Sequence, residues 1–319
     1  MNDAQTSQWS GYSLEGCVFE ETLSAAPQMD ASDRQLPKSI DMRVHCSRVE
    51  DQKNTNSCVA QTTIGALEFH QKKAGVAFKD MSSLFVYWNA RFLAARAHLD
   101  GGSLIHHGLA AVMAHGACED RLWPFDPSKV LVPPPMETFN NATKHEAVQY
   151  ARTPLGHSVL TAVAEGLPVL FGTFMPKRFY EEAHAKGVMP ISRDRKGPLP
   201  NFGHAMLIVG YDLADKTYLV RNSWGPQWGD QGYCRIPFST LETWSRTDHF
   251  WAIGAIEQAL GFKLSGPSMV DAMKGVGVKD DDLQVGGKAL DRLRSDVRSR
   301  LSTDLETAKR DFRKRLRGE

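Results

Sequence analysis

Residues 218–236 read YLVRNSWGPQWGDQGYCRI, and this stretch decides the fold. It opens on an apolar, β-branched run typical of a strand and closes on a second such run, GYCRI. Asn222 ends the first run, and Trp224 follows two residues later. An amide at a strand end can accept a hydrogen bond from an imidazole N–H, and a flat indole beside it can shield that bond from water. Asn222 could therefore fix the tautomer of a histidine that the fold places beside it.

The chain holds eleven histidines, so a histidine alone says little. His204 is the informative one, because it directly precedes the apolar run AMLIVG in the segment NFGHAMLIVGYD, residues 201–212. That run is typical of a buried strand, which would hold the imidazole on a rigid element. His204 lies eighteen residues before Asn222. Taken alone, His204 would be better interpreted as a satisfied core histidine, and only its context favours catalysis.

A third stretch, DQKNTNSCVAQTTIGALEF at residues 51–69, places one thiol at the start of a helix. After Cys58, apolar residues at 60, 64 and 67 fall on one helical face. Unpaired N–H groups at a helix N-terminus favour the thiolate, which is the nucleophilic form of cysteine. A histidine partner would stabilise the thiolate further and could then donate a proton to a leaving group. Gln52 lies six residues before Cys58.

The composition is that of an ordinary globular protein of 319 residues, with 42% hydrophobic and 24% charged residues. A net charge of +1 gives no global field that would point to nucleic acid. The most apolar stretch is short and contains Glu165 and Pro168, so we expect no transmembrane segment. The N-terminus lacks the pattern of a signal peptide, which predicts a cytoplasmic protein or one exported by another route.

Five cysteines at wide spacings, without a Cys/His cluster, predict reduced thiols and no metal site or cofactor. Apart from Cys58, they are expected to be structural: Cys17, Cys46, Cys118 and Cys234. His106, His107 and His115 share one helical stretch without carboxylates at ligand spacing, so they are not predicted metal ligands.

The chain divides into an N-terminal extension (1–36), a main domain (37–260), a linker (261–287) and a charged amphipathic helix (288–319). Within the main domain, helical patterns dominate over about 40–130 and strand patterns over about 135–260, which predicts an α+β fold. Expected helices begin at Cys58 and cover residues 83–99, 105–116 and 158–166. Expected strands cover 169–174, 205–211, 217–222 and 232–236.

Together these stretches resemble the papain-like cysteine peptidases. The order Gln, Cys, His, Asn agrees with that family, and NSWGPQWGDQGYCRI is similar to its NSWG-x-x-WG-x-x-GY block. LPKSIDMR at 36–43 resembles the opening of the mature enzyme. The resemblance implies a papain-like fold with a helical left subdomain, a β-barrel-like right subdomain and the active cleft between them.

The resemblance also implies roles for individual residues. Cys58 would be the nucleophile, His204 the general base and acid, and Asn222 the residue that orients His204. The side chain of Gln52 and the Cys58 backbone N–H would hold the oxyanion. Residues implied around the substrate cleft are Gly101, Gly102, Ala205 and Trp224, with Trp224 also covering the Asn–His contact.

The sequence departs from the family pattern in two places. Thr55 stands where the family usually has a second cysteine, and Val59 stands where it usually has tryptophan. The usual long helical propeptide is also absent, because only about 36 residues precede the mature-like start. These features resemble intracellular or injected bacterial members of the family more than lysosomal ones.

The function expected from the resemblance is a cysteine endopeptidase acting on protein or peptide substrates. Two alternatives stay open: an acyl transferase or transglutaminase with the same Cys-His apparatus, and an inactive peptidase fold that binds a partner. The tail from 288 to 319 has 11 Lys/Arg and 6 Asp/Glu residues. Its apolar residues form one continuous stripe at helical spacing. It is expected either to lie on its own acidic body or to pair with another copy or a regulatory protein. Binding to a membrane surface is the third alternative, which the modest apolar face without tryptophan disfavours.

Overall fold

A computed structural model describes residues 12–13, 35–143, 150–197, 199 and 202–254. The predicted linker and charged C-terminal helix, and most of the predicted N-terminal extension, lie outside these residues. No helix within the described ranges is long and apolar enough to cross a membrane.

The helical half contains the elements α2 (Cys58–Lys73), α3 (Ser83–Leu93), α4 (Ile105–His115) and α5 (Met136–Ala142). Three short 3₁₀ helices accompany them: Arg43–His45, Asp120–Leu122 and Pro127–Lys129. The predicted start of α2 at Cys58 is confirmed. Helix α3 ends at Leu93, earlier than the pattern through residue 99 suggests, because Ala95 adopts a left-handed conformation with φ of 55° that stops the helix.

The β-rich half is built on the strands β3 (Tyr150–Arg152), β4 (Val169–Thr173), β5 (Phe202–Asp212), β6 (Thr217–Arg221), β7 (Tyr233–Pro237) and β8 (Ser245–Ile253). Their order in the sheet is β3-β8-β4-β5-β6-β7, and β2 (Ser39–Asp41) and β1 (Tyr12–Ser13) pair with β5 outside this path. The four predicted strands are confirmed. The predicted barrel-like closure is wrong, because the path runs from β3 to β7 without closing.

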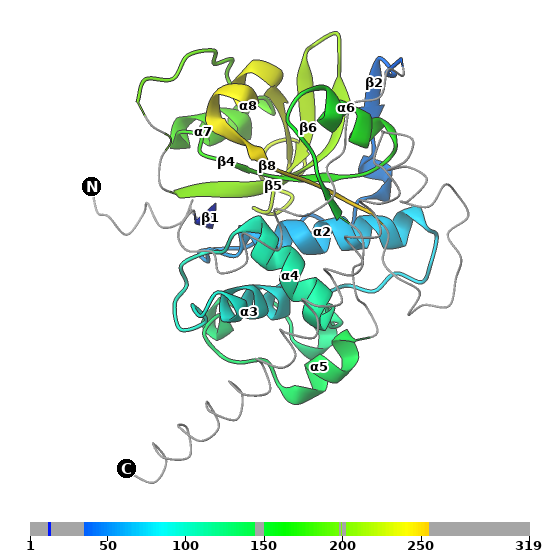
Figure 1. Cartoon of the computed structure of the whole chain (residues 1–319), viewed down its shortest axis with the longest axis vertical. Helices are drawn as coiled ribbons and strands as arrows, with labels where there is room; N and C mark the ends of the chain where they lie inside the picture. Colours follow the sequence, from blue (N-terminus) through cyan, green and yellow to red (C-terminus); the bar gives the residue numbers. More distant parts are fainter. Residues whose placement is uncertain (1–11, 14–34, 144–149, 198, 200–201, 255–319) are drawn as a thin grey trace.

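Three helices accompany this sheet: α6 (His157–Ala164), α7 (Lys177–Lys186) and α8 (Phe238–Trp244). The pattern at 158–166 predicted α6, whereas α7, α8 and the strands β3 and β8 were not predicted. Figure 1 shows α2 lying between the sheet with α6–α8 above it and α3–α5 below it. Helix α2 is therefore the element that joins the two halves.

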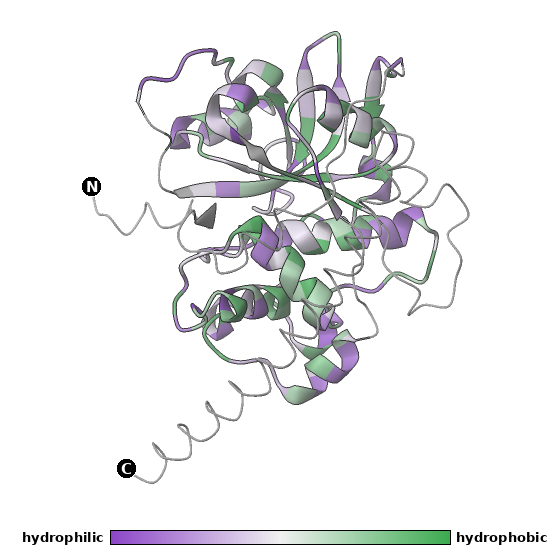
Figure 2. Ribbon diagram, viewed as in Figure 1, coloured by the Kyte–Doolittle hydropathy of each residue, from purple (hydrophilic) through white to green (hydrophobic). Residues whose placement is uncertain are grey.

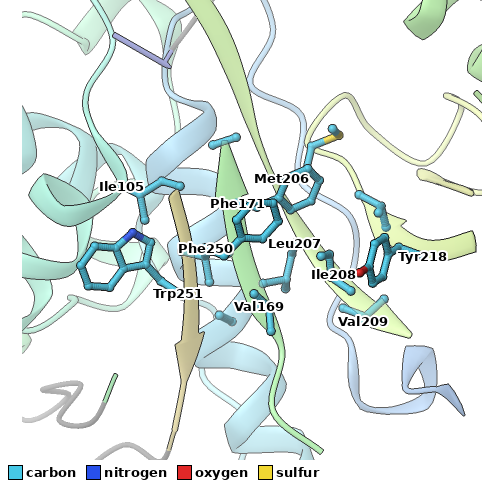
Figure 3. Packing of buried hydrophobic residues seen from close by; sticks show 14 of the residues in the cluster. Ile105, Val169, Phe171, Met206, Leu207, Ile208, Val209, Tyr218, Phe250 and Trp251 are labelled. Atoms are coloured by element: carbon cyan, nitrogen blue, oxygen red, sulfur yellow. The ribbon is translucent and has the colours of Figure 1, made fainter. Parts of the chain in front are cut away.

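Packing explains why α2 occupies this position. Thirteen of its residues are buried, so it is covered on almost every side. Helix α4 approaches it closely at Gly108, where an added Cβ would lie 2.8 Å from Val59. The sheet face carries apolar side chains, and Phe171 and Phe250 on adjacent strands stack with centroids 5.6 Å apart (Figure 3). Figure 2 shows that the inner strands of the sheet are largely hydrophobic.

Candidate active site

The thiol of Cys58 lies at the first residue of α2, where the N-terminal N–H groups have no intrahelical acceptor. Ser57 occupies the N-cap position, but its side chain makes no capping hydrogen bond. The backbone N–H of Ala205 on β5 donates a hydrogen bond of 3.4 Å to Cys58 Sγ. The carbonyl of Ala205 accepts a hydrogen bond of 3.1 Å from Thr62 Oγ1 on α2. These contacts fix the register of the helix against the strand and bring the thiol beside the residue that follows His204.

His204 and Asn222 come together although they lie on different segments. His204 is in β5, and Asn222 directly follows the adjacent strand β6. His204 Nε2 and Asn222 Oδ1 are 2.6 Å apart. Within the described part of the chain, His204 Nδ1 has no hydrogen-bond partner. One ring nitrogen is thus held by the amide, and the other remains available for proton transfer.

Aromatic rings enclose the imidazole. Trp224 stacks on His204 with ring centroids 4.6 Å apart and an interplanar angle of 21°. Tyr180 presents its ring edge to His204 at 5.7 Å and to Trp224 at 5.2 Å. Trp228 packs edge-on against Trp224 at 5.3 Å. This enclosure keeps water away from the contact between His204 and Asn222.

Tyr180 is a neighbour of the site that the sequence analysis missed. It lies on α7, where Phe179, Tyr180 and Ala183 form a buried stripe at helical spacing. Pro176 precedes this helix, and Gly187 follows it in a left-handed conformation, which are ordinary start and stop signals. These signals could have located α7, but nothing in them places Tyr180 beside His204.

The side chain of Gln52 is buried and held in one orientation. Its Oε1 accepts a hydrogen bond of 2.6 Å from Ser223 Oγ, and its Nε2 donates one of 2.9 Å to the Thr55 carbonyl. The backbone N–H of Gln52 also donates to the Ser223 carbonyl at 2.9 Å. Ser223, the residue after Asn222, therefore holds Gln52 in place. The segment 222–223 thus positions both His204 and Gln52. An amide nitrogen has two hydrogens, and Thr55 takes one of them.

The glycine pair lies beside the segment that leads into α2. Asp100, which precedes Gly101, accepts a hydrogen bond of 3.1 Å from the Asn56 backbone N–H, and its carbonyl accepts one of 2.7 Å from Asn56 Nδ2. Gly102 has a φ of 75° and donates its N–H to Tyr87 Oη at 3.2 Å. Asp100 was not singled out from the sequence, although its position just before the glycine pair could have indicated it.

Burial decides the charge of the resting site. Cys58 and His204 are 0% and 1% exposed. Burial raises the pKa of Cys58 to about 12, although the N–H groups of Ala205, Val59 and Cys58 itself act in the opposite direction. Burial lowers the pKa of His204 to about 4, although the bond to Asn222 opposes this. Burial therefore opposes the charged form of both side chains, whereas the helix start favours the thiolate of Cys58.

The N-terminal strand β1 pairs with the start of β5, next to His204. Tyr12 pairs with Gly203 and Ser13 with Phe202, immediately before His204. An extended backbone therefore fits against this end of β5. At Gly203 an added Cβ would lie 2.5 Å from the Thr173 carbonyl, so a side chain has no room there.

Comparison with known proteins agrees with this geometry. The sequence profile described as "Papain family cysteine protease" matches residues 36–243. An uncharacterised peptidase C1-like protein of Acanthamoeba polyphaga mimivirus is 28% identical over 247 residues, covering 74% of this chain and 78% of that protein. Cathepsin L of Sarcophaga peregrina is 26% identical over 243 residues, covering 73% of this chain and 68% of that protein.

Among solved structures, xylellain, a cysteine protease from Xylella fastidiosa, superimposes with a TM-score of 0.68 at 23% identity. The match covers 78% of this chain and 98% of xylellain. At this identity the likeness establishes the fold, which is papain-like and α+β. The predicted bacterial origin and cytoplasmic location stay predictions.

Proposed function

The chain belongs to the papain family of cysteine proteases and is a cysteine peptidase, and on this premise we propose that it is an endopeptidase in which Cys58, His204 and Asn222 act together. The observation that carries the proposal is the hydrogen bond of 2.6 Å between His204 and Asn222, next to a strand residue that contacts Cys58 Sγ. This arrangement leaves His204 Nδ1 as the nitrogen that can exchange a proton with Cys58 and the substrate.

In the proposed reaction His204 acts first as a base and then as an acid. Nδ1 takes the thiol proton as Cys58 Sγ attacks the carbonyl carbon of the scissile peptide bond, giving a tetrahedral oxyanion. The imidazolium then donates its proton to the leaving amine, and a thioester to Cys58 remains. A water molecule, deprotonated by His204, attacks the thioester and releases the carboxylic product and the thiol.

Burial of His204 suits this sequence of steps, because it lowers the pKa of the imidazole and so favours its neutral form. A neutral imidazole can accept a proton, whereas an imidazolium cannot. Asn222 supports the proposal because its Oδ1 accepts a hydrogen bond from Nε2–H, which keeps Nδ1 as the basic nitrogen. Its amide also stays bonded when His204 becomes positively charged.

Gln52 and the Cys58 backbone N–H are the proposed donors to the oxyanion. Both belong to rigid segments, because Gln52 is fixed by Ser223 and Thr55 and Cys58 begins α2. Fixed donors stabilise charge that develops in the transition state without having to reorganise. The pairing of β1 with β5 beside His204 supports an extended backbone as the form of the substrate.

The test is the fate of the acyl group. The purified protein is incubated with a denatured protein and with a short peptide, with and without a primary amine, and the products are weighed by mass spectrometry. We expect internal cleavage, with one water added across each broken peptide bond. Products in which two chains, or a chain and the amine, are joined would favour acyl transfer, and absence of any product would favour an inactive binding fold.

A further inference from the structure

Three carboxyl groups lie close together beside α2, around a residue ten positions after Cys58. Glu50 lies on the connection that leads to α2, Glu68 lies within α2, and Asp80 lies on the loop before α3. One oxygen from each lies within 4.8 Å of the other two. Since the three residues come from separate segments, no motif spacing predicts the cluster.

Glu68 is the member that most needs a partner. Its side chain is 0% exposed. Oε1 accepts a hydrogen bond of 2.9 Å from the Met81 N–H, whereas Oε2, also buried, has no hydrogen-bond partner in the described structure. A buried carboxylate oxygen without a partner is costly, so an occupant that satisfies it would stabilise the fold.

The nearby cation Arg221 acts to lower the pKa of Glu50 and of Glu68, but its hydrogen bonds go to other groups. Arg221 is buried, and its Nη1 donates a hydrogen bond of 3.0 Å to Ser47 Oγ while its Nη2 donates to the Arg48 carbonyl. Among the described residues, neither Glu50, Glu68 nor Asp80 forms an ion pair within 4.0 Å.

A fourth acid adds to the negative charge. The Asp120 N–H donates a hydrogen bond of 2.7 Å to the Asp80 carbonyl, which brings Asp120 beside the cluster. The Ser47 hydroxyl, which accepts from Arg221, lies close enough to Glu68 to lower the pKa of its carboxyl group. Arg221 and Arg48 are the cations that act on Glu50, so four acidic side chains face two guanidinium groups.

We propose that Glu50, Glu68 and Asp80 bind one hard divalent cation of the calcium type. Carboxylate oxygens are the ligands that such cations prefer, and calcium binds them at about 2.3–2.6 Å. Two ligands on opposite sides of a calcium ion are then about 5 Å apart, a span that the three oxygens do not exceed. Asp80 is exposed, which gives the ion a route from solvent to the buried Glu68.

The position gives the site a structural role. Glu50 lies two residues before Gln52, and its carbonyl accepts a hydrogen bond of 2.8 Å from the Gly225 N–H. A cation would tie this connection to α2 and to the loop at Asp80. It would thereby brace the segment that carries Gln52.

The experiment uses the full chain freed of metal by a chelator and then dialysed. Calcium is titrated in by calorimetry and the thermal midpoint is followed, with magnesium in a parallel series. We expect one saturable calcium site and a midpoint that rises with calcium. Two variants remove ligands while keeping the side-chain shape: Glu68→Gln, which retains the acceptor for Met81, and Asp80→Asn, which changes an exposed residue. Each should weaken calcium binding at least tenfold.

The matched control is Glu181→Gln, because Glu181 is an exposed glutamate on α7, where it pairs with Lys177 at 3.5 Å. This control should bind calcium as the unmodified chain does. Absence of saturable calcium binding, preference for magnesium, or calcium binding that is unchanged in Glu68→Gln and in Asp80→Asn would overturn the proposal. A Glu68→Gln variant whose midpoint rises by the same amount with and without calcium would overturn it too, because the cluster would then hold protons instead of a cation.

Discussion

Helix α2 carries a buried polar centre at its first residue and another ten residues later, and the two are built differently. Around Cys58, His204 is bonded to Asn222 and Gln52 to Ser223. Around Glu68, three carboxyl groups face one another and one buried oxygen has no partner within the described residues. The first centre is held together by hydrogen bonds between its own side chains and leaves His204 Nδ1 without a partner among the described residues, whereas the second brings together three groups that repel one another when charged.

Loss of the thiol should have the largest effect on the first centre. Cys58→Ala removes the nucleophile, so we expect turnover of a peptide substrate to fall on the order of a million-fold, to the residual rate of the remaining donors. The fold should persist, since the change only shortens a side chain. Cys118→Ala, which alters another fully buried thiol, is the matched control and should keep its activity. The reverse pattern would place the nucleophile elsewhere.

Loss of the proposed oxyanion donor should have the next largest effect. Gln52→Ala should lower kcat by about 100- to 1,000-fold with little change in KM, because the donor acts on charge that forms only in the transition state. Steady-state kinetics separate the two parameters. Unchanged kcat, or a change confined to KM, would remove Gln52 from the oxyanion site. Glu181→Gln again serves as the surface control.

Loss of the orienting amide should have a smaller effect. Asn222→Ala should lower kcat/KM by about 100-fold, because the imidazole loses the bond that fixes its orientation. In the unmodified chain the acid limb of the pH profile should lie near the His204 pKa of about 4, since a protonated imidazole cannot accept the thiol proton. Asn222→Asp should move that limb to higher pH, because a carboxylate favours the imidazolium. An unmoved limb would show that Asn222 does not act through His204.

The acidic centre should affect stability and not chemistry, and this is the smallest effect. Burial raises the pKa of Glu68 to about 8 and of Glu50 to about 7 in the folded chain. The folded state therefore holds more protons than the unfolded chain between about pH 4.5 and 8, so stability should fall as pH rises through this range in chelator. The thermal midpoint measures this. A flat midpoint from pH 5 to 8, or an equal slope in Glu68→Gln, would contradict it.

The contrast between the two centres also explains what the sequence could predict. Cys58, His204, Asn222 and Trp224 lie in stretches whose local pattern suggested their proposed roles. The structure places His204 against Asn222 and Trp224, and the next residue, Ala205, against Cys58. Strand periodicity located β4 to β7 because these strands are apolar and β-branched. Helix α7 was missed because its short buried stripe is broken by charged residues, and Tyr180 was missed with it.

Features that depend on long-range packing could not be predicted. Barrel-like closure depends on how the edge strands β3 and β7 end, which no local pattern records. The charge state of Cys58 depends on its complete burial between the two halves, and burial opposes the thiolate that the helix start favours. Glu50, Glu68 and Asp80 are brought together by tertiary structure alone.

The most direct test of the central claim is to identify the cysteine that reacts. The native chain and a His204→Ala variant are treated with a limiting amount of iodoacetamide, and peptide mass spectrometry gives the alkylation rate at each cysteine. The account predicts that Cys58 is alkylated first in the native chain, and that its rate falls to that of the other buried thiols when His204 is replaced. Equal rates at Cys46, Cys58, Cys118 and Cys234 in the native chain, or a Cys58 rate independent of His204, would contradict it.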